Sequence, residues 1–343
     1  MTTLVSIHSG RRVAVLVAVV WLSACATLPV ASATDAAPAS TNVARVLWRD
    51  PGDVSGLDVV NGSGGRANAP DPTLRFDFVS EDVADTSPKF EVRDAHGVIW
   101  KAKLGEEARP ETAATRLLWV AGYLTDQDYY LSALTVNGLP KLRRGSQLVT
   151  AGNVIHGVRL ERKPADSRKL GQWDWFSNPF VGGRELNGLR VMMLLLNNWD
   201  LKAVNNAVYD EGGALRYVVS DLGATFGQGG NAMQRSKSSP VDYAATTFIE
   251  RVTASSVDFT LHSRPFFLWI INPPNYRSRT RMEQLSRDIP RTDAAWVGVQ
   301  LARLSDSQIS DCFRAAGYSD GEVEVLARVV RRRIAELRGL GAG

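Results

Sequence analysis

Cysteine and histidine are scarce in this chain of 343 residues, which has two cysteines and four histidines. The histidines are scattered, at positions His8, His96, His156 and His262. Zinc sites need cysteine and histidine ligands at short, regular spacings, and the chain offers none of these spacings. The sequence therefore gives no indication of a zinc centre.

A strong excess of one charge is also missing. The net charge of +4 is small, and no lysine or arginine run alternates with aromatic residues as a single-strand binder requires. This pattern argues against a nucleic-acid partner. Hydrophobic residues make up 44% of the chain and charged residues 22%, which is ordinary for a globular protein. The length is sufficient for one large domain or two lobes.

The apolar stretch near the N-terminus, residues 13–22, is too short to span a membrane. It follows Arg11 and Arg12 and ends in small residues before Cys25. A basic start, a short apolar run and small residues at the end are typical of a signal peptide. The sequence therefore predicts a signal peptide over residues 1–24.

The residues Leu22-Ser23-Ala24-Cys25 resemble the lipobox of bacterial lipoproteins. The resemblance implies cleavage before Cys25 and a lipid on its thiol, hence an exported lipoprotein anchored in the cell envelope. With Ala26 next, it implies the outer membrane in a Gram-negative host. An ordinary signal peptide with a chance cysteine is the alternative. Cys312 then lacks a partner, so we expect no disulfide and interpret it as a buried apolar residue in a helix over 306–316.

Residues 25–72 are rich in Ala, Thr, Pro, Gly, Ser and Asn. Their main apolar patch is 43–48, which predicts a short strand. Such a composition is typical of a flexible tether, here one that lifts a domain off a membrane. The Asn61-Gly62-Ser63-Gly64-Gly65 run lacks a strand-to-helix setting and is interpreted as a flexible turn.

A strand-rich lobe is predicted over residues 73–165. Alternating apolar residues indicate strands, and Pro110, with Glu111 in the first turn and Gly122 after the end, delimits a helix. The predicted strands are 74–79, 89–93, 98–104, 129–136 and 154–162.

A mainly helical lobe is predicted over residues 166–343. Residues 185–197 are apolar almost all round, which predicts a buried helix, and 207–209 with 216–220 predict a hairpin. The rest is predicted helical, most clearly at 282–287, 293–304, 306–316 and 321–337. Strands first and helices after give an α+β fold of two lobes.

Polar residues between the buried helix and the hairpin carry the strongest functional signal. Residues 198–205 read Asn-Trp-Asp-Leu-Lys-Ala-Val-Asn, and Ser-Asp-Leu-Gly follows at 220–223. Phosphoryl transfer needs a group that positions the incoming hydroxyl, a cation for the transferred phosphate, and oxygen ligands for magnesium. Asp200, Lys202, Asn205 and Asp221 supply these groups.

The ordering of these residues resembles the protein-kinase-like superfamily, and most closely its atypical bacterial and secretory branches such as the HipA toxins and the CotH spore-coat kinases. The resemblance implies a two-lobed fold with an antiparallel-sheet N-lobe and a helical C-lobe. It also implies a role for each residue: Lys103 contacts the nucleotide phosphates, Glu111 holds Lys103, Asp200 is catalytic, Lys202 neutralises the phosphate in transfer, and Asn205 with Asp221 ligates Mg²⁺.

The sequence departs from the family pattern at several places. Lys101 lies on the same strand face as Lys103, so the choice of lysine stays open. Asn198 and Trp199 replace the usual histidine and arginine. An acidic segment, 81–88, stands where a glycine-rich loop is usual, and Thr86, Ser87 or backbone amides would serve as phosphate donors there. No Ala-Pro-Glu motif follows Asp221.

The sequence thus predicts a phosphotransferase that uses Mg²⁺ and ATP or another nucleotide, with a protein or small molecule as acceptor. The alternative is a non-catalytic kinase-fold lipoprotein that binds a ligand or partner at the cell envelope, where ATP is scarce. A purely structural lipoprotein does not explain the Asp-x-Lys-x-x-Asn spacing. Chemistry is favoured slightly, because burying Asp200 and Asp221 near each other without a cation is costly.

Overall fold

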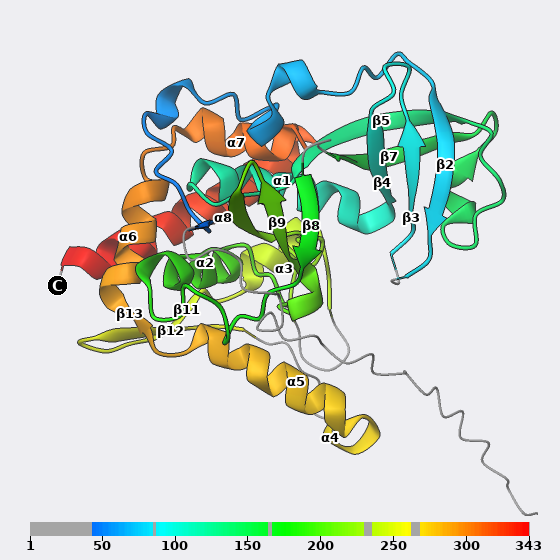
Figure 1. Cartoon of the computed structure of the whole chain (residues 1–343). Coiled ribbons are helices and arrows are strands. Elements are labelled where there is room, and N and C mark those ends of the chain that lie inside the picture. Colours follow the sequence, from blue (N-terminus) through cyan, green and yellow to red (C-terminus); the bar gives the residue numbers. More distant parts are fainter. Residues whose placement is uncertain (1–42, 85–86, 164–166, 230–234, 262–267, 343) are drawn as a thin grey trace, which may run out of the picture. The chain divides into compact units, whose positions relative to one another are not determined.

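The structure is a computed structural model that describes residues 43–84, 87–163, 167–229, 235–261 and 268–342. The predicted signal peptide, Cys25 and Thr86 lie outside these residues. Strands dominate the N-terminal part and helices the C-terminal part (Figure 1). The α+β class predicted from the sequence is confirmed.

The N-terminal strands form one sheet in the order β4-β3-β2-β5-β7-β6, and an additional β4–β7 pairing closes the sheet on itself. The sheet is antiparallel except for a short parallel contact between β2 and β5. Its strands are β2 (Phe76–Asp82), β3 (Lys89–Arg93), β4 (Ile99–Leu104), β5 (Gln127–Asn137), β6 (Val149–Thr150) and β7 (Val154–Arg162).

A hydrophobic core lies inside this closed sheet, because apolar residues alternate along its strands. Phe90 and Val92 on β3 are fully buried, and Val158 and Leu160 on β7, also two positions apart, bury their side chains in the same cluster. Side chains at every second position share one face of a strand, so this alternation fixes the register. The strands predicted at 89–93 and 154–162 match β3 and β7 residue for residue.

Helix α1 (Ala108–Val120) follows β4 through the short 3-10 helix η4 (Gly105–Glu107). It begins two residues before Pro110, which lies in the first turn, where a missing N–H costs no intrahelical hydrogen bond. Gly122 follows the end with a φ of +93°. A Cβ at Gly122 would lie 2.3 Å from the Arg49 carbonyl oxygen, so both the conformation and the space require glycine.

The helices of the C-terminal part share a second hydrophobic core with one face of α1. Met192 and Leu195 of α2, Cys312 of α7 and Val330 of α8 are completely buried in this core, and Cys312 is a free thiol. The helices are α2 (Arg184–Leu195), α3 (Pro240–Ala245), α4 (Leu268–Ile271), α5 (Pro273–Glu283), α6 (Arg291–Leu301), α7 (Asp306–Arg314) and α8 (Asp320–Gly339).

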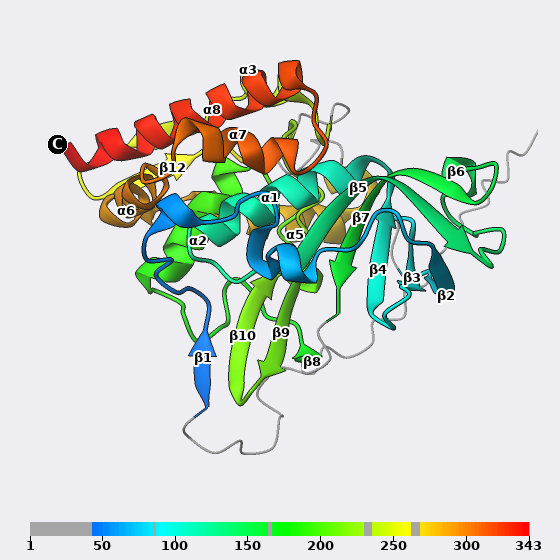
Figure 2. The same ribbon diagram turned by 90° about the horizontal axis from the view of Figure 1, so that it is seen from above.

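The predicted hairpin after α2 is part of a larger sheet. Strands β9 (Asn206–Glu211) and β10 (Ala214–Val219) pair with each other, β8 (Ser167–Gly171) adds to β9, and β1 (Ala44–Val46) adds in parallel to β10 (Figure 2). The hairpin therefore joins two segments that are far apart in the sequence.

The prediction that the remaining residues are helical was wrong in one region. The strands β11 (Ile249–Val252), β12 (Ser256–Phe259) and β13 (Ile289–Pro290) form a small sheet. Each is short, and β13 pairs with β12 across a long stretch of chain. Such short strands carry little periodic signal of their own.

The prediction of a flexible tether was also wrong from residue 44 onward. Leu47, Val54 and Val59 are buried in the second core, and the Trp48 indole donates a hydrogen bond of 2.7 Å to the Ala121 carbonyl. Gly62 serves close packing here, because a Cβ at this position would lie 2.4 Å from the Arg116 guanidinium. This stretch is part of the folded core.

Within the described residues, the structure contains no helix long and apolar enough to cross a bilayer. Membrane attachment through Cys25 concerns a residue outside that part and stays a prediction.

Leu47→Ala tests whether this N-terminal stretch belongs to the core. Because Leu47 is 3% exposed, we expect the substitution to lower the free energy of unfolding by about 2–5 kcal/mol. Val60→Ala is the control, since Val60 is 52% exposed and its loss should change stability by no more than about 0.5 kcal/mol. Urea denaturation measures both. Equal, small effects would show that residues 44–72 do not contribute to folding.

Candidate active site

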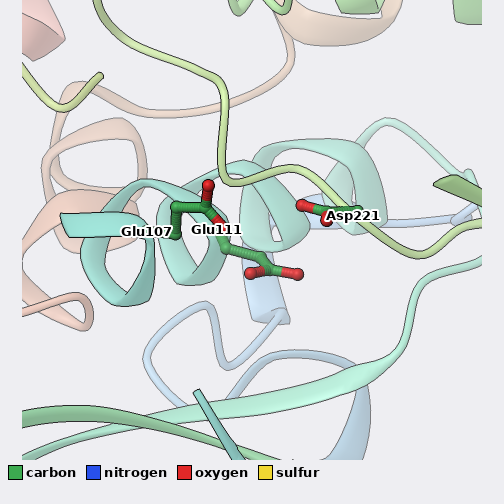
Figure 3. Close-up of side chains that lie close together, drawn as sticks. All are labelled: Glu107, Glu111 and Asp221. Carbon is green, nitrogen blue, oxygen red and sulfur yellow. The ribbon is translucent and has the colours of Figure 1, made fainter. Parts of the chain in front are cut away.

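The Lys103 ammonium lies at the centre of a cluster of carboxylates. Its Nζ is 2.7 Å from Glu111 Oε2, 3.2 Å from Glu107 Oε2 and 3.2 Å from Asp221 Oδ1. Figure 3 shows the three acidic side chains converging, with Glu107 and Glu111 on neighbouring turns and Asp221 on a separate loop. Lys103 is only 4% exposed, so these contacts replace its hydration.

Local geometry explains why these residues meet. Lys103 lies near the end of β4, and Gly105, with a φ of +81°, lets the chain turn sharply into η4. Glu107 is four residues after Lys103, and Glu111 is four residues further, in the first turn of α1. Asp221 comes directly after the hairpin of β9 and β10. In the described part of the chain, Lys103 makes these contacts and Lys101 does not.

The charges in the cluster depend on one another. Burial alone would lower the pKa of the Lys103 ammonium, but the surrounding carboxylates, Glu111 first, outweigh burial and hold the pKa above its ordinary value. Burial, opposed by the charges of Arg159 and Lys103, raises the pKa of Glu111 to about 7. Lys103 therefore stays charged, while burial raises the proton affinity of Glu111.

Arg159 of β7 supports Glu111 from the side of the sheet. Its Nε is 3.5 Å from Glu111 Oε2, and its guanidinium also pairs with Asp128 and, at 3.0 Å, with Glu161. Arg159 is 1% exposed, so these carboxylates compensate a charge that is otherwise costly to bury. Glu111 is thus held between a strand lysine and a strand arginine.

Asp221 is the most accessible member of the cluster. Burial pulls its pKa upward, but the Lys103 ammonium and the Gly223 N–H, 3.1 Å from Oδ1, outweigh burial and lower the pKa to about 2. Its side chain is 42% exposed, so solvent screens the pairing with Lys103 more than burial alone would suggest. An ionised, accessible carboxylate at this position is suited to act as a ligand of a metal cation.

Asp200 is held by residues of its own loop. Its backbone N–H donates to the Asn198 side-chain oxygen at 3.0 Å, and Asn205 Nδ2 donates to the Asp200 carbonyl at 2.6 Å and to Oδ2 at 3.3 Å. The Lys202 ammonium is 2.8 Å from Asp200 Oδ1. Asn198 thus positions the aspartate through the Asp200 backbone.

Backbone hydrogen bonds join the Asp200 loop to Asp221. The Asn205 carbonyl accepts from the Ser220 N–H at 2.8 Å and from the Asp221 N–H at 3.2 Å. The structure therefore brings the predicted site residues together in two groups. One group is Lys103, Glu111 and Asp221, and the other is Asp200, Lys202 and Asn205. The backbone hydrogen bond between Asn205 and Asp221 links the two groups.

Sequence reasoning missed Glu107 and Lys237. Glu107 contacts Lys103, accepts a hydrogen bond of 2.7 Å from Ser87 Oγ, and pairs with the Lys237 ammonium. The spacing of four residues between Lys103, Glu107 and Glu111 was a readable signal for Glu107. Lys237 had no comparable signal, because its contact is with a residue 130 positions away.

Mg²⁺ requires oxygen donors, and the site offers several. The carboxylates of Glu107, Glu111 and Asp221 lie close enough to share an ion, but the Lys103 ammonium already contacts all of them. Among the described residues, the Asn205 side-chain nitrogen donates to Asp200, and the Asn205 backbone carbonyl accepts from the Asp221 N–H at 3.2 Å. A carboxylate and an amide oxygen fit Mg²⁺, which takes few protein ligands besides water and phosphate.

No family model matches this chain, and no curated protein does. Among solved structures, the chain is similar to the proinflammatory kinase CtkA of Helicobacter pylori, with 10% identity and a TM-score of 0.44. The superposition covers 77% of this chain and 97% of that chain.

A separate cavity of about 250 Å³ lies away from the Lys103 cluster. Its lining includes Arg49, Ser63, Trp119, Gly122 and Arg216, so it is bordered by the N-terminal stretch and the end of α1. This lining does not include Lys103, Asp200 or Asp221, and we therefore take the Lys103 cluster as the candidate site.

Asp221→Asn tests the charge pairing at this site. A pKa lowered from 3.8 to about 2 contributes stability that is present above pH 3.8 and is lost as the pH falls toward 2. The stability difference between the parent and Asp221→Asn should therefore shrink over that window in urea titrations. Asp320→Asn, which removes an exposed carboxylate on α8, is the control. A difference that does not change with pH would mean that Asp221 is not paired with Lys103.

Proposed function

We propose that this chain is a kinase-like phosphotransferase that uses a nucleotide and Mg²⁺. The supporting observation is the buried Lys103–Glu111 ion pair beside Asp221, with Asp221 tied to the Asp200 loop through Asn205. Kinase chemistry needs a strand lysine that pairs with a helix glutamate. It also needs an aspartate that lies next to a loop with a second aspartate and an asparagine.

Lys103 supplies the cation for the nucleotide phosphates. Glu111 and Arg159 fix its position, because Glu111 is fully buried and contacts both cations. Preorganised charge of this kind contributes to catalysis because the protein need not rearrange when the phosphate arrives. Ser87, whose hydroxyl already bonds Glu107, lies at the site where the sequence lacks a glycine-rich loop.

Asn205 and Asp221 would hold the magnesium ion. When bound, the ion neutralises charge on the phosphate oxygens. The Asn205 backbone fixes the distance between the Asp200 loop and Asp221, so the two groups act as one unit.

Asp200 orients the acceptor hydroxyl and takes its proton. The acceptor oxygen forms a bond to the γ-phosphorus, the bond from that phosphorus to the bridging oxygen breaks, and the nucleoside diphosphate leaves. Lys202, 2.8 Å from Asp200, carries the positive charge that stabilises the phosphate in transfer.

Binding without turnover is the second candidate function. It is supported by Asp221, which already pairs with Lys103, and by Trp199, which stands where the family has an arginine. An exported protein would also meet little ATP. In this case the fold would hold a ligand or partner at the cell envelope.

Nucleotide titration tests the assignment of Lys103. We expect Lys103→Gln to weaken ATP binding in the presence of Mg²⁺ by at least about tenfold, because a charge-assisted contact to phosphate is lost. Lys101→Gln on the same strand is the matched control and should bind like the parent. Calorimetry measures the affinities, and circular dichroism checks folding, since Lys103→Gln leaves buried carboxylates without their cation.

Two further variants, measured in the same titration, separate the proposed metal-binding role of Asp221 from the proposed catalytic role of Asp200. Asp221→Ala should remove the dependence of nucleotide binding on Mg²⁺, whereas Asp200→Ala should keep binding and lose roughly 10²–10⁴-fold in phosphoryl transfer. If both variants bind nucleotide like the parent with and without Mg²⁺, the metal assignment is wrong. A parent chain that binds no nucleotide would favour the non-catalytic function.

We also propose that the chain is a lipoprotein anchored through Cys25. The support is the basic and apolar leader that ends in Leu22-Ser23-Ala24-Cys25. The first described strand, β1, begins at Ala44, so roughly twenty residues would separate it from the lipid, a length that a flexible linker could span.

Mass spectrometry of the membrane-extracted chain tests this anchor. We expect the first residue of the mature chain to be a diacylglyceryl-modified Cys25. Cys25→Ser should abolish the modification and release the chain from membranes, because a signal peptide alone leaves no lipid behind. An unmodified cysteine, or cleavage at another position, would contradict the proposal.

A further inference from the structure

A group of cations surrounds the indole of Trp199, the residue directly before Asp200. The Arg235 guanidinium is 4.7 Å from the ring centroid, the Lys237 ammonium 5.6 Å, and the Arg279 guanidinium 6.0 Å. Trp199 is 8% exposed and Arg279 is 6% exposed, so the ring and one cation are largely buried. We call Trp199, Arg235, Lys237 and Arg279 the Trp199 cation cluster.

The cluster contains three cations. The carboxylates beside it include Asp200, which also holds Lys202, and Glu107, which pairs with both Lys237 and Lys103. Burial and the positive charge of Arg279 lower the pKa of Arg235 to about 10. Cations so close to each other gain most from an additional anion.

The cluster is adjacent to both reacting groups of the proposed site. Lys237 pairs with Glu107, and Glu107 contacts Lys103, so the cluster borders the proposed nucleotide site. Trp199 precedes Asp200 in the chain, so the cluster also borders the proposed acceptor position. An anionic group bound here would present a neighbouring hydroxyl to Asp200.

Helix α5 contributes one cation to the cluster, because Arg279 lies over Trp199. Arg277 and Arg281 are each two positions from Arg279, so they lie on the opposite face of the helix, where both are exposed. Arg281 is 57% exposed and pairs with Asp174 at 3.1 Å. Cations spread over two segments suit an extended ligand with several negative charges better than a single phosphate ion.

We propose that the Trp199 cation cluster binds an acidic peptide and that this peptide carries the acceptor hydroxyl. The inference rests on the proposed phosphotransferase function for the transfer step, and on the cluster alone for binding. It identifies the acceptor class as a serine- or threonine-containing segment flanked by aspartate or glutamate.

Peptide binding without nucleotide tests the cluster independently of catalysis. Two fluorescein-labelled peptides of equal length are compared by anisotropy, one with a central serine flanked by glutamates and one with the serine flanked by lysines. The full chain should bind the acidic peptide at least about tenfold more tightly, and the binding should weaken as salt is added.

Charge-removing variants locate the binding surface. Arg235→Gln and Lys237→Gln should each weaken binding of the acidic peptide by about tenfold, because a contact to a charged group is lost. Arg328→Gln is the matched control: Arg328 lies on α8, is 65% exposed and pairs with Glu324, so its loss should change binding less than about twofold. Equal affinity for both peptides, or an equal effect of all three variants, would overturn the inference.

Phosphoryl transfer from ATP and Mg²⁺ to the same peptides separates the inference from the proposed function. Transfer to the acidic peptide supports both. Tight binding of the acidic peptide without transfer supports the cluster and contradicts the phosphotransferase function. Transfer only to the lysine-flanked peptide, or only to serines of the chain itself, would overturn the inference and leave the function standing.

Discussion

The buried ammonium of Lys103 is the interaction on which the rest of the site depends. A charge removed from water is costly unless carboxylates compensate it, and here they come from η4, from α1 and from the loop after β10. The pairing therefore fixes the closed N-terminal sheet, helix α1 and the Asp221 loop relative to one another at this point. Glu111 contributes most, because its carboxylate also meets Arg159 of β7.

The order of charges explains how the site is suited to phosphate chemistry. Lys103 and Arg159 bracket one carboxylate, and the Asp221 carboxylate remains partly exposed at the edge. The Asn205 backbone links Asp221 to the Asp200 loop through hydrogen bonds. Trp199, the residue before Asp200, contacts the cations of the Trp199 cation cluster. Positive and negative groups thus alternate from the proposed nucleotide position to the proposed acceptor position.

Features encoded locally could be predicted from the sequence. Strands β3 and β7 were predictable because alternation reports directly on a half-buried strand, and the Asp200 loop because its residues lie within one short segment. The burial of Leu47 and the Glu107–Lys237 pair were not predictable, because each depends on residues more than one hundred positions away or on a packed core. Gly62 and Gly64 misled in the same way, because their small size serves packing against Arg116 and Tyr129.

A crystal structure of the chain with a non-hydrolysable ATP analogue and Mn²⁺ tests the central claim most directly, because Mn²⁺ prefers the same oxygen ligands as Mg²⁺ and its anomalous scattering locates it. The account predicts one Mn²⁺ bound by the Asp221 carboxylate and the Asn205 side-chain oxygen, with the α and β phosphates contacting Lys103. A nucleotide bound in the cavity between Arg49 and Arg216, or a Mn²⁺ ion that does not contact Asp221, would contradict it.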